Sequence, residues 1–340
     1  MPREVEPSLN EKQFFAKALQ ENVRLDGRAF DQFRALELDF GDEYGVADVR
    51  LGKTRYVMHS ILVISLQFFC VSRKLLNFIK VMKVLTNNHR RVHAHITAEV
   101  TTPFPDRPFD GIFTITTELS PMTSPSIEIN RPSETETLLS RLLEKTIRRS
   151  GALDTESLCL IAGSKCWSIR ADVHVLSHDG NLVDASCIAV IAALQHFRKP
   201  DTSTEGEQVT VYTVREREPV PLSLLHFPLC VTFSFYGEGV LGKGSEDDGE
   251  VVLVDANLME EQLREGSVTV GVNRHGEVCQ IAKLGGVPVD AVALLHSVNV
   301  AGVKVKELSK FITGRLEADA KKRDKGGMMA ELRADNDRVS

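Results

Sequence analysis

The sequence predicts an α+β protein made of two similar halves, each a sheet with helices on one face. A series of short apolar strands is followed by helices, and this order then occurs a second time. A polar run at 201–208 separates the two series and is typical of a linker. The length of 340 residues and an apolar fraction of 42% fit about two domains around a sizeable core.

The first half is expected to begin with a helix over 9–22. Ser8 and Glu11 form a capping box, and apolar residues then recur at helical spacing. Partly alternating apolar residues predict four strands, at 34–40, 46–54, 92–101 and 111–118. The proline-rich segment 103–108 separates the last two, because a strand interior does not tolerate several prolines.

A second capping box, Ser133 with Glu136, opens a long amphipathic helix that Gly151 ends. Two further strands are predicted, at 158–162 and 166–176. The turn at 178–181 then leads into a helix over 184–197. This helix carries few charges and is expected to be buried.

The second half repeats the pattern. Five strands are predicted, at 209–214, 229–236, 250–254, 267–273 and 278–284. An apolar helix over 288–300 and an amphipathic helix over 303–318 follow. From 319 on, the chain is charged, which predicts a solvated helix end and then a disordered tail.

Charge and cysteine usage narrow the functional classes. With 41 Lys and Arg against 47 Asp and Glu, the net charge is −6, which argues against a protein that grips nucleic acid alone with a broad basic face. The six cysteines form no C-x-x-C pair, so we expect reduced thiols rather than zinc or disulfides. The acidic, polar N-terminus shows no signal-peptide pattern, which favours an intracellular protein.

Three motifs give the chain a family resemblance. They are the Arg-Leu-Asp-Gly-Arg run at 24–28, the Asp-Thr-Glu-Ser-Leu-Cys run at 154–159, and the strand, turn and helix start at 170–188. Together they resemble the RNase PH family, in the branch of RNase PH-like subunits of the eukaryotic RNA exosome core. The resemblance covers most of 8–330 and implies the RNase PH fold, which is ribosomal protein S5 domain 2-like.

The resemblance also divides the chain. Residues 1–30 would hold the N-terminal helix and the Arg-Leu-Asp-Gly-Arg turn, and 31–199 the first RNase PH half with an anomalous insertion at 56–91. Residues 200–318 would form the C-terminal half, and 319–340 the charged tail.

Residues 56–91 depart from everything around them. They contain six Lys or Arg and no acidic residue, and their apolar run at 61–71 is too short to span a membrane. In the family, the strand ending at Arg55 runs directly on into the equivalent of Val92, so the segment interrupts one strand. Our hypothesis is a retained intron. A lineage-specific surface insertion is the alternative, and a basic helix on a membrane surface is a more remote one.

The resemblance places a degenerate catalytic site at the turn before the apolar helix. Phosphorolytic members hold inorganic phosphate there with a Gly-Thr-Arg element at a helix N-terminus. Leu182 and Val183 stand in place of Thr and Arg, and Asp184 adds a negative charge. Of the acidic pair that active members need, Asp255 matches one and no carboxylate matches the other.

No catalytic residue, metal or cofactor is therefore expected. Glu260 and Glu261, which lie close by in the sequence, have the pattern of a solvated helix face. Arg24 and Arg28 have the local pattern of a charged turn, to which the resemblance adds structural and interface value.

The function that the resemblance implies is structural. The chain would be a non-catalytic subunit of a hetero-hexameric ring of RNase PH-like subunits, beneath S1/KH cap subunits and with associated hydrolytic nucleases. It would guide single-stranded RNA through the channel, with Arg107 and Arg131 as candidate contacts, in rRNA 3′-end maturation and mRNA decay. Nucleus, nucleolus and cytoplasm are the implied locations, with no membrane partner.

Two alternatives remain. One is an active phosphate-dependent 3′–5′ exoribonuclease, alone or with residues shared across a dimer. The other is an RNA-binding module that acts alone, which the acidic net charge disfavours.

Overall fold

The computed structural model describes most of the chain outside 62–93. The described residues are 7–41, 43–52, 54–61, 94–124, 127–128, 131, 133–206, 208–213, 216–237 and 251–323. Within them, no helix is both long and apolar enough to cross a membrane.

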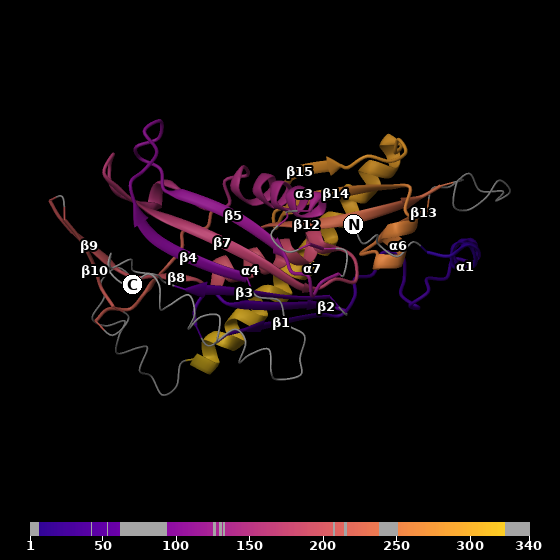
Figure 1. The fold of residues 1–340 in the computed structure, drawn as a ribbon, viewed down its shortest axis with the longest axis horizontal. Helices are drawn as coiled ribbons and strands as arrows, with labels where there is room; N and C mark the ends of the chain where they lie inside the picture. The colour runs from indigo at the N-terminus through magenta and orange to yellow at the C-terminus, as the bar shows by residue number, and fades with distance from the viewer. Residues whose placement is uncertain are drawn as a thin grey trace.

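Two sheets with helices packed between and around them form the molecule (Figure 1). The first sheet has seven strands: β1 (Leu36–Phe40), β2 (Ala47–Leu51), β3 (Thr54–Ile61), β4 (Ala94–Thr101), β5 (Ile112–Leu119), β6 (Cys159–Ile161) and β7 (Lys165–Ser177). The second has four, in the order β13 (Val251–Val254), β12 (Pro228–Tyr236), β14 (Gly266–Asn273) and β15 (Val278–Lys283). The predicted α+β fold is confirmed.

The described helices are α1 (Leu9–Gln20), α3 (Glu134–Leu143), α4 (Leu182–His196), α6 (Leu258–Leu263) and α7 (Ala291–Arg323). The π-helical turn η1 (Glu144–Arg148) continues α3, and a short 3₁₀ turn, η2 (Glu156–Leu158), precedes β6. Both predicted capping boxes are formed, at Ser8 with Glu11 and at Ser133 with Glu136.

Helix α4 joins the two halves into one core. It is apolar on nearly all sides, and twelve of its fifteen residues are buried. Such a helix needs cover all round, and α4 finds it between β2 and β3 of the first sheet and β12 of the second. A single apolar cluster therefore runs through both halves, from Leu38 in β1 to Ile312 in α7.

Strands β3 and β4 occupy consecutive positions along the same neighbour, β7. Tyr56 pairs with Val175 and Val57 with His174, and Ala94 then pairs with Val173. Ala94, which lies 37 residues after Val57 in the sequence, thus takes the position on β7 directly next to that of Val57. If Arg55 were joined directly to Val92, residues 92 and 93 would take the two positions that 56 and 57 now hold. The register therefore fits the predicted interruption of one strand.

Two expectations for the second half are wrong. The linker at 201–208 is instead a hairpin of β9 (Thr202–Glu205) and β10 (Gln208–Val211), which turns at Gly206 with φ +63°. Two very short strands, β8 (Arg198–Lys199) and β11 (Val220–Pro221), pair beside it. The two C-terminal helices are one helix, α7, of 33 residues. Gly302 does not break it, because a glycine costs a helix only about 1 kcal/mol.

The end of α7 is docked rather than solvated. Asp319 lies 3.2 Å from Nε2 of the buried His196, and the Arg323 guanidinium lies over the Tyr44 ring. Burial, together with the charge of Arg323, lowers the pKa of His196 to about 4. The predicted tail beyond 323 falls outside the described residues.

Candidate functional site

The turn before α4 is held against the second half of the chain. Gly180 adopts φ +87°, and a Cβ there would lie 2.5 Å from the carbonyl oxygen of Ala256. Asn181 has a left-handed backbone with φ +54° and caps the helix. Leu182 and Val183 follow and pack, partly buried, against the core. The first turn of α4 therefore presents apolar side chains to the core at the two positions where the sequence predicted a degenerate phosphate site.

Asp184 is fully buried and points into the protein. Its carboxylate accepts hydrogen bonds from the Thr232 backbone N–H at 2.8 Å, the Thr232 hydroxyl at 2.7 Å and Asn181 Nδ2 at 2.9 Å. Burial raises the pKa of Asp184 to about 7, and the nearby charge of Asp255 adds to the rise while these hydrogen bonds oppose it. The predicted carboxylate beside the turn is present, as part of the packing between α4 and β12.

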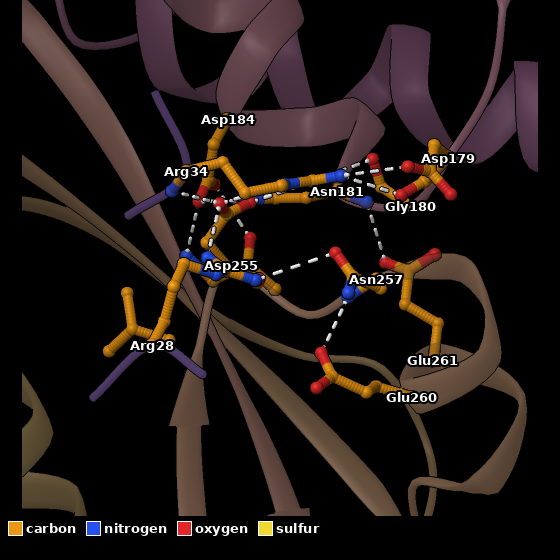
Figure 2. A network of polar contacts seen from close by, with 12 residues as sticks. Arg28, Arg34, Asp179, Gly180, Asn181, Asp184, Asp255, Asn257, Glu260 and Glu261 are labelled. Carbon is orange, nitrogen blue, oxygen red and sulfur yellow. Dashed lines mark hydrogen bonds and ion pairs between the residues drawn. The ribbon is translucent and has the colours of Figure 1, made fainter. Parts of the chain in front are cut away.

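Asp255 is the centre of the network drawn in Figure 2. It ends β13 with a left-handed backbone, φ +52°, and its side chain is fully buried. Arg34 binds both carboxylate oxygens, through Nε at 2.9 Å and Nη2 at 2.8 Å, and its backbone N–H donates at 2.8 Å. Asn181 Nδ2 donates at 2.6 Å and Arg28 Nη1 at 3.1 Å. Burial alone would raise the pKa of Asp255, but the bonds and charge of Arg34 outweigh it and hold the pKa below its ordinary value.

Within the Arg-Leu-Asp-Gly-Arg turn, Arg24 alone is buried and acts as an anchor, which agrees with the structural value that the resemblance adds to it. Its side chain is fully buried and donates to the Val254 and Asp255 carbonyl oxygens at 2.9 and 2.6 Å. It also pairs in a bidentate way with Glu260, at 2.9 and 2.7 Å. Arg28 is less buried and reaches Asp26 at 2.6 Å.

The expected solvated face at Glu260 and Glu261 is also wrong. Glu260 is 1% exposed, and its carboxylate binds Arg24 and caps α6 through the Asn257 backbone N–H at 2.7 Å. Glu261 accepts the Asn181 backbone N–H at 3.0 Å. Burial raises the pKa of Glu261, while Arg264 and the Asn181 bond oppose that rise. A carboxylate of the protein thus already occupies the N-terminal end of α4, where a helix attracts an anion.

The cations of the network are directed at groups of the protein itself. Besides Asp255, Arg34 donates to the carbonyl oxygens of Asp179 at 2.7 Å and Gly180 at 3.2 Å. The described residues include no group of three or more His, Cys, Asp or Glu side chains placed to hold a metal ion. The chemistry that this arrangement supports is cross-linking: the N-terminal segment, the α4 turn and the β13–α6 turn are tied together by buried ion pairs.

The two candidate RNA contacts lie at opposite ends of β7. Arg107 lies in the loop between β4 and β5. The last residue of β4 pairs with Cys166 of β7, and the first residue of β5 pairs with Ser168 of β7. The α4 turn lies beyond Ser177, roughly 35 Å away along the strand at about 3.3 Å per residue. Arg107 is 76% exposed and lies 3.9 Å from Asp110.

Arg131 lies two residues before Ser133, the N-cap of α3, and the Glu136 carbonyl of α3 accepts the Thr117 hydroxyl at 3.2 Å. Thr117 of β5 pairs with Val173, toward the Ser177 end of β7. The Arg131 side chain is 62% exposed and lies 3.5 Å from Glu128. The fold therefore does not bring Arg107 and Arg131 together, and RNA contact stays a prediction for each.

Sequence reasoning missed Arg34, Asn181 and Thr232. An isolated arginine before a strand carries no local signal, and the partner of Arg34 lies 221 residues away. Asn181 did carry a signal, because Asn is enriched several-fold among the non-glycine residues that adopt a left-handed backbone.

The raised pKa of Asp184 gives a testable pH dependence. The folded group holds its proton up to about pH 7, whereas the unfolded group loses it near 3.8. The folded state therefore binds the extra proton, and wild-type stability from this group falls as pH rises through this window. Asp184→Asn removes the titrating carboxyl group but keeps a hydrogen-bond acceptor and a hydrogen-bond donor at the same positions. Its stability relative to wild type is expected to rise with pH from 4 to 7, by up to about 4 kcal/mol.

Urea unfolding of both proteins across that pH range measures the difference between their free energies of unfolding. The contributions of other titrating groups, such as His196, are common to both proteins and cancel in this difference. Asp106→Asn, at an exposed carboxylate in the 103–110 loop, is the matched control and should give a nearly flat difference. A flat difference for Asp184→Asn would show that the folded carboxylate ionises as it does in the unfolded chain.

Comparison with known proteins agrees with this architecture. The 3′ exoribonuclease family models match at residues 83–200 for domain 1 and 226–296 for domain 2. Exosome complex component rrp45 of Schizosaccharomyces pombe is 45% identical over 324 residues, covering 95% of this chain and 96% of that protein. RRP45 of Saccharomyces cerevisiae is 43% identical and covers 97% of each chain. Human RRP45 is 38% identical over 93% of this chain and 62% of its own length.

Solved structures give the same result. A chain of the Archaeoglobus fulgidus exosome with RNA bound to the active site superposes with a TM-score of 0.65 at 25% identity, over 87% of this chain and 96% of that one. A chain of an archaeal exosome core has a TM-score of 0.64 at 24% identity over 89% and 96%, which supports the fold. Together, these matches show that the chain belongs to the RNase PH family, in the branch of the exosome components named RRP45.

Proposed function

We propose that the chain is a non-catalytic structural subunit of the RNA exosome core ring. Its relatives are named as exosome complex components, and a similar solved chain belongs to an exosome with RNA bound to the active site. Within such a ring, the chain would sit among other RNase PH-like subunits and help guide single-stranded RNA.

The carboxylate of Glu261 at the N-terminus of α4 is the observation that carries the non-catalytic part. Phosphorolysis needs a phosphate dianion beside the scissile bond, and a helix N-terminus with a nearby arginine is a suitable holder. Here the Asn181 N–H donates to Glu261, and Arg34 donates to Asp255. A bound phosphate would have to displace the first carboxylate while lying close to the second.

The neighbouring side chains support the same proposal. Leu182 and Val183 have apolar side chains that contribute neither a hydroxyl nor a cation, and both pack against the core. Asp184 and Asp255 are each fully buried and bonded within the protein, so neither is available as a general acid or metal ligand.

The proposal extends to the cap subunits, the associated hydrolytic nucleases and the cellular roles. We place the chain in nucleus, nucleolus and cytoplasm, where it supports rRNA 3′-end maturation and mRNA decay. Depletion of the chain should lead to 3′-extended rRNA precursors, and a fluorescent fusion should be found in these compartments.

The deciding experiment determines the composition of the purified assembly and then tests it for phosphorolytic activity. The tagged chain is purified gently from its own cells, and its native mass and partners are determined. The expected result is a large stoichiometric assembly with other RNase PH-like chains. Recovery as a free monomer or homo-oligomer would contradict the scaffold role.

The purified chain, alone and in its assembly, is then incubated with labelled RNA and inorganic phosphate. No nucleoside diphosphate should be released, and calorimetry with inorganic phosphate should show no binding to the free chain. Release of nucleoside diphosphates by the free chain would instead establish the active phosphorolytic enzyme.

A further inference from the structure

The outer face of α3 and η1 carries three exposed cations in a row: Arg141, Lys145 and Arg149. Together with Glu144 they line a shallow cavity of about 290 Å³. This surface, called the α3 cation row below, lies apart from the buried network around Asp255.

The π-helical turn explains why the three side chains meet. In a regular α-helix, residues eight apart diverge by about 80° around the axis. The turn over Glu144–Arg148 takes more residues per turn, because its hydrogen bonds run from i to i+5. It therefore reduces the divergence, and Arg141 and Arg149 line the same cavity. Such single π-turns within α-helices are frequent at functional sites.

The row is positively charged within an acidic protein. Among the described residues, no side-chain ion pair or hydrogen bond is made by Arg141, Lys145 or Arg149. The one carboxylate of the cavity, on Glu144, is already paired with Arg148 at 2.8 Å. The full chain carries a net charge of −6, so three unpaired cations on one cavity stand out from their surroundings.

The spacing fits a nucleic-acid backbone. Residues four apart on a helix are separated by about 6 Å along the axis, and the phosphates of one strand of a DNA duplex advance by about 3.4 Å along its axis. Successive cations of the row therefore match alternate phosphates. Two of the three are arginines, whose planar guanidinium can bind a phosphate in a bidentate way.

The row also follows a path across both halves. Helix α3 begins next to β5, where the Thr117 hydroxyl bonds to the Glu136 carbonyl. The following turn reaches the second sheet, where the Thr146 hydroxyl bonds to Gln280 at 2.7 Å. Figure 1 shows α3 in this position between β5 and β15. The row therefore lies on a helix whose inner face is buried and whose residues bond to both sheets.

We propose that Arg141, Lys145 and Arg149 bind the phosphodiester backbone of single-stranded RNA. The proposal rests on the proposed exosome function, since it locates a place where this chain touches RNA. RNA is preferred to an acidic protein segment as the occupant because the proposed function already requires this chain to contact RNA.

The test replaces all three cations by glutamine, in the chain as purified within its own assembly. Binding of a fluorescent uridine oligonucleotide is followed by anisotropy at a series of salt concentrations. Each phosphate contact on a single strand contributes about 0.7 to the salt slope, so the slope is expected to fall by about 2. The matched control changes Lys306, Lys310 and Lys321 to glutamine, which are exposed cations on α7, and should leave the slope unchanged.

Other outcomes overturn the proposal. An unchanged slope in the Arg141/Lys145/Arg149 variant would remove RNA from this surface while the assembly stays intact. Unchanged RNA binding with loss of one co-purifying protein would assign the row to an acidic protein partner. If the wild-type chain is recovered outside any assembly, the proposed function fails. The same salt series on the free chain then still decides whether the row binds RNA.

Discussion

Asp255→Ala is expected to lower the free energy of unfolding by about 3–5 kcal/mol. The side chains of Asp255 and Arg34 are 0% and 7% exposed, so the substitution leaves a buried guanidinium without its bidentate partner. It also removes an acceptor from Arg28 and from Asn181. Urea unfolding at neutral pH measures the loss.

A double variant separates the ion pair from its surroundings. Adding Arg34→Met to Asp255→Ala removes the unpaired charge. The double variant should therefore lose less free energy of unfolding than the two single variants lose in sum. Asp31→Ala is the matched surface control. Its carboxylate is 66% exposed and lies 3.7 Å from Lys304. The substitution should therefore change the free energy of unfolding by no more than about 0.5 kcal/mol. A similarly small effect for Asp255→Ala would show that solvent reaches Arg34 and compensates its charge.

Deletion of residues 56–91 is expected to raise the stability of the chain. The register along β7 leaves two positions, opposite Val175 and His174, that Val92 and His93 could fill once Arg55 is joined to Val92. Residues 56–61 belong to β3, and about 32 residues connect Ile61 to Ala94. Closing a loop of about this length costs about 3 kcal/mol in chain entropy, and the deletion removes up to this amount.

The matched control keeps the length and changes the sequence. A variant with 56–91 replaced by a glycine- and serine-rich segment of equal length retains the loop cost, so its stability should lie near wild type and below the deletion variant. Unfolding of the deletion variant under conditions where wild type is folded would contradict the joined strand and favour a real insertion. Sequencing the message across codons 50–95 tests the retained-intron hypothesis separately, since a spliced form joins Arg55 to Val92, or Thr54 to Arg91.

The elements were predictable from the sequence where local signals are strong. Capping boxes at Ser8 and Ser133 placed two helix starts within a residue, and the apolar run after Leu182 predicted the central helix. The hairpin at 202–211 was missed although Gly206 gave a turn signal, because its strands are short and polar. The division of the C-terminal helix at Gly302 was wrong because apolar packing outweighs the small helical penalty of one glycine.

The candidate site was predictable in position but not in architecture. The family motif located Leu182, Val183, Asp184 and Asp255, and the structure brings the two carboxylates near each other through Asn181. The role of the N-terminal arginines was not visible, since their partners lie more than 220 residues away. The sequence around Glu260 has the pattern of a surface helix. Its carboxylate is buried in the structure through an ion pair with Arg24, which comes from the other end of the chain.

The close contact at Gly180 constrains how this protein can be recombined with its relatives. A Cβ at Gly180 would lie 2.6 Å from backbone atoms of both Asn257 and Leu258, so two main chains from different halves touch without an intervening side chain. No rotamer change can absorb a shift of one against the other. A chimera that takes its C-terminal half from another family member must therefore reproduce the backbone path at 256–258 or bring the donor's own 178–181 turn with it.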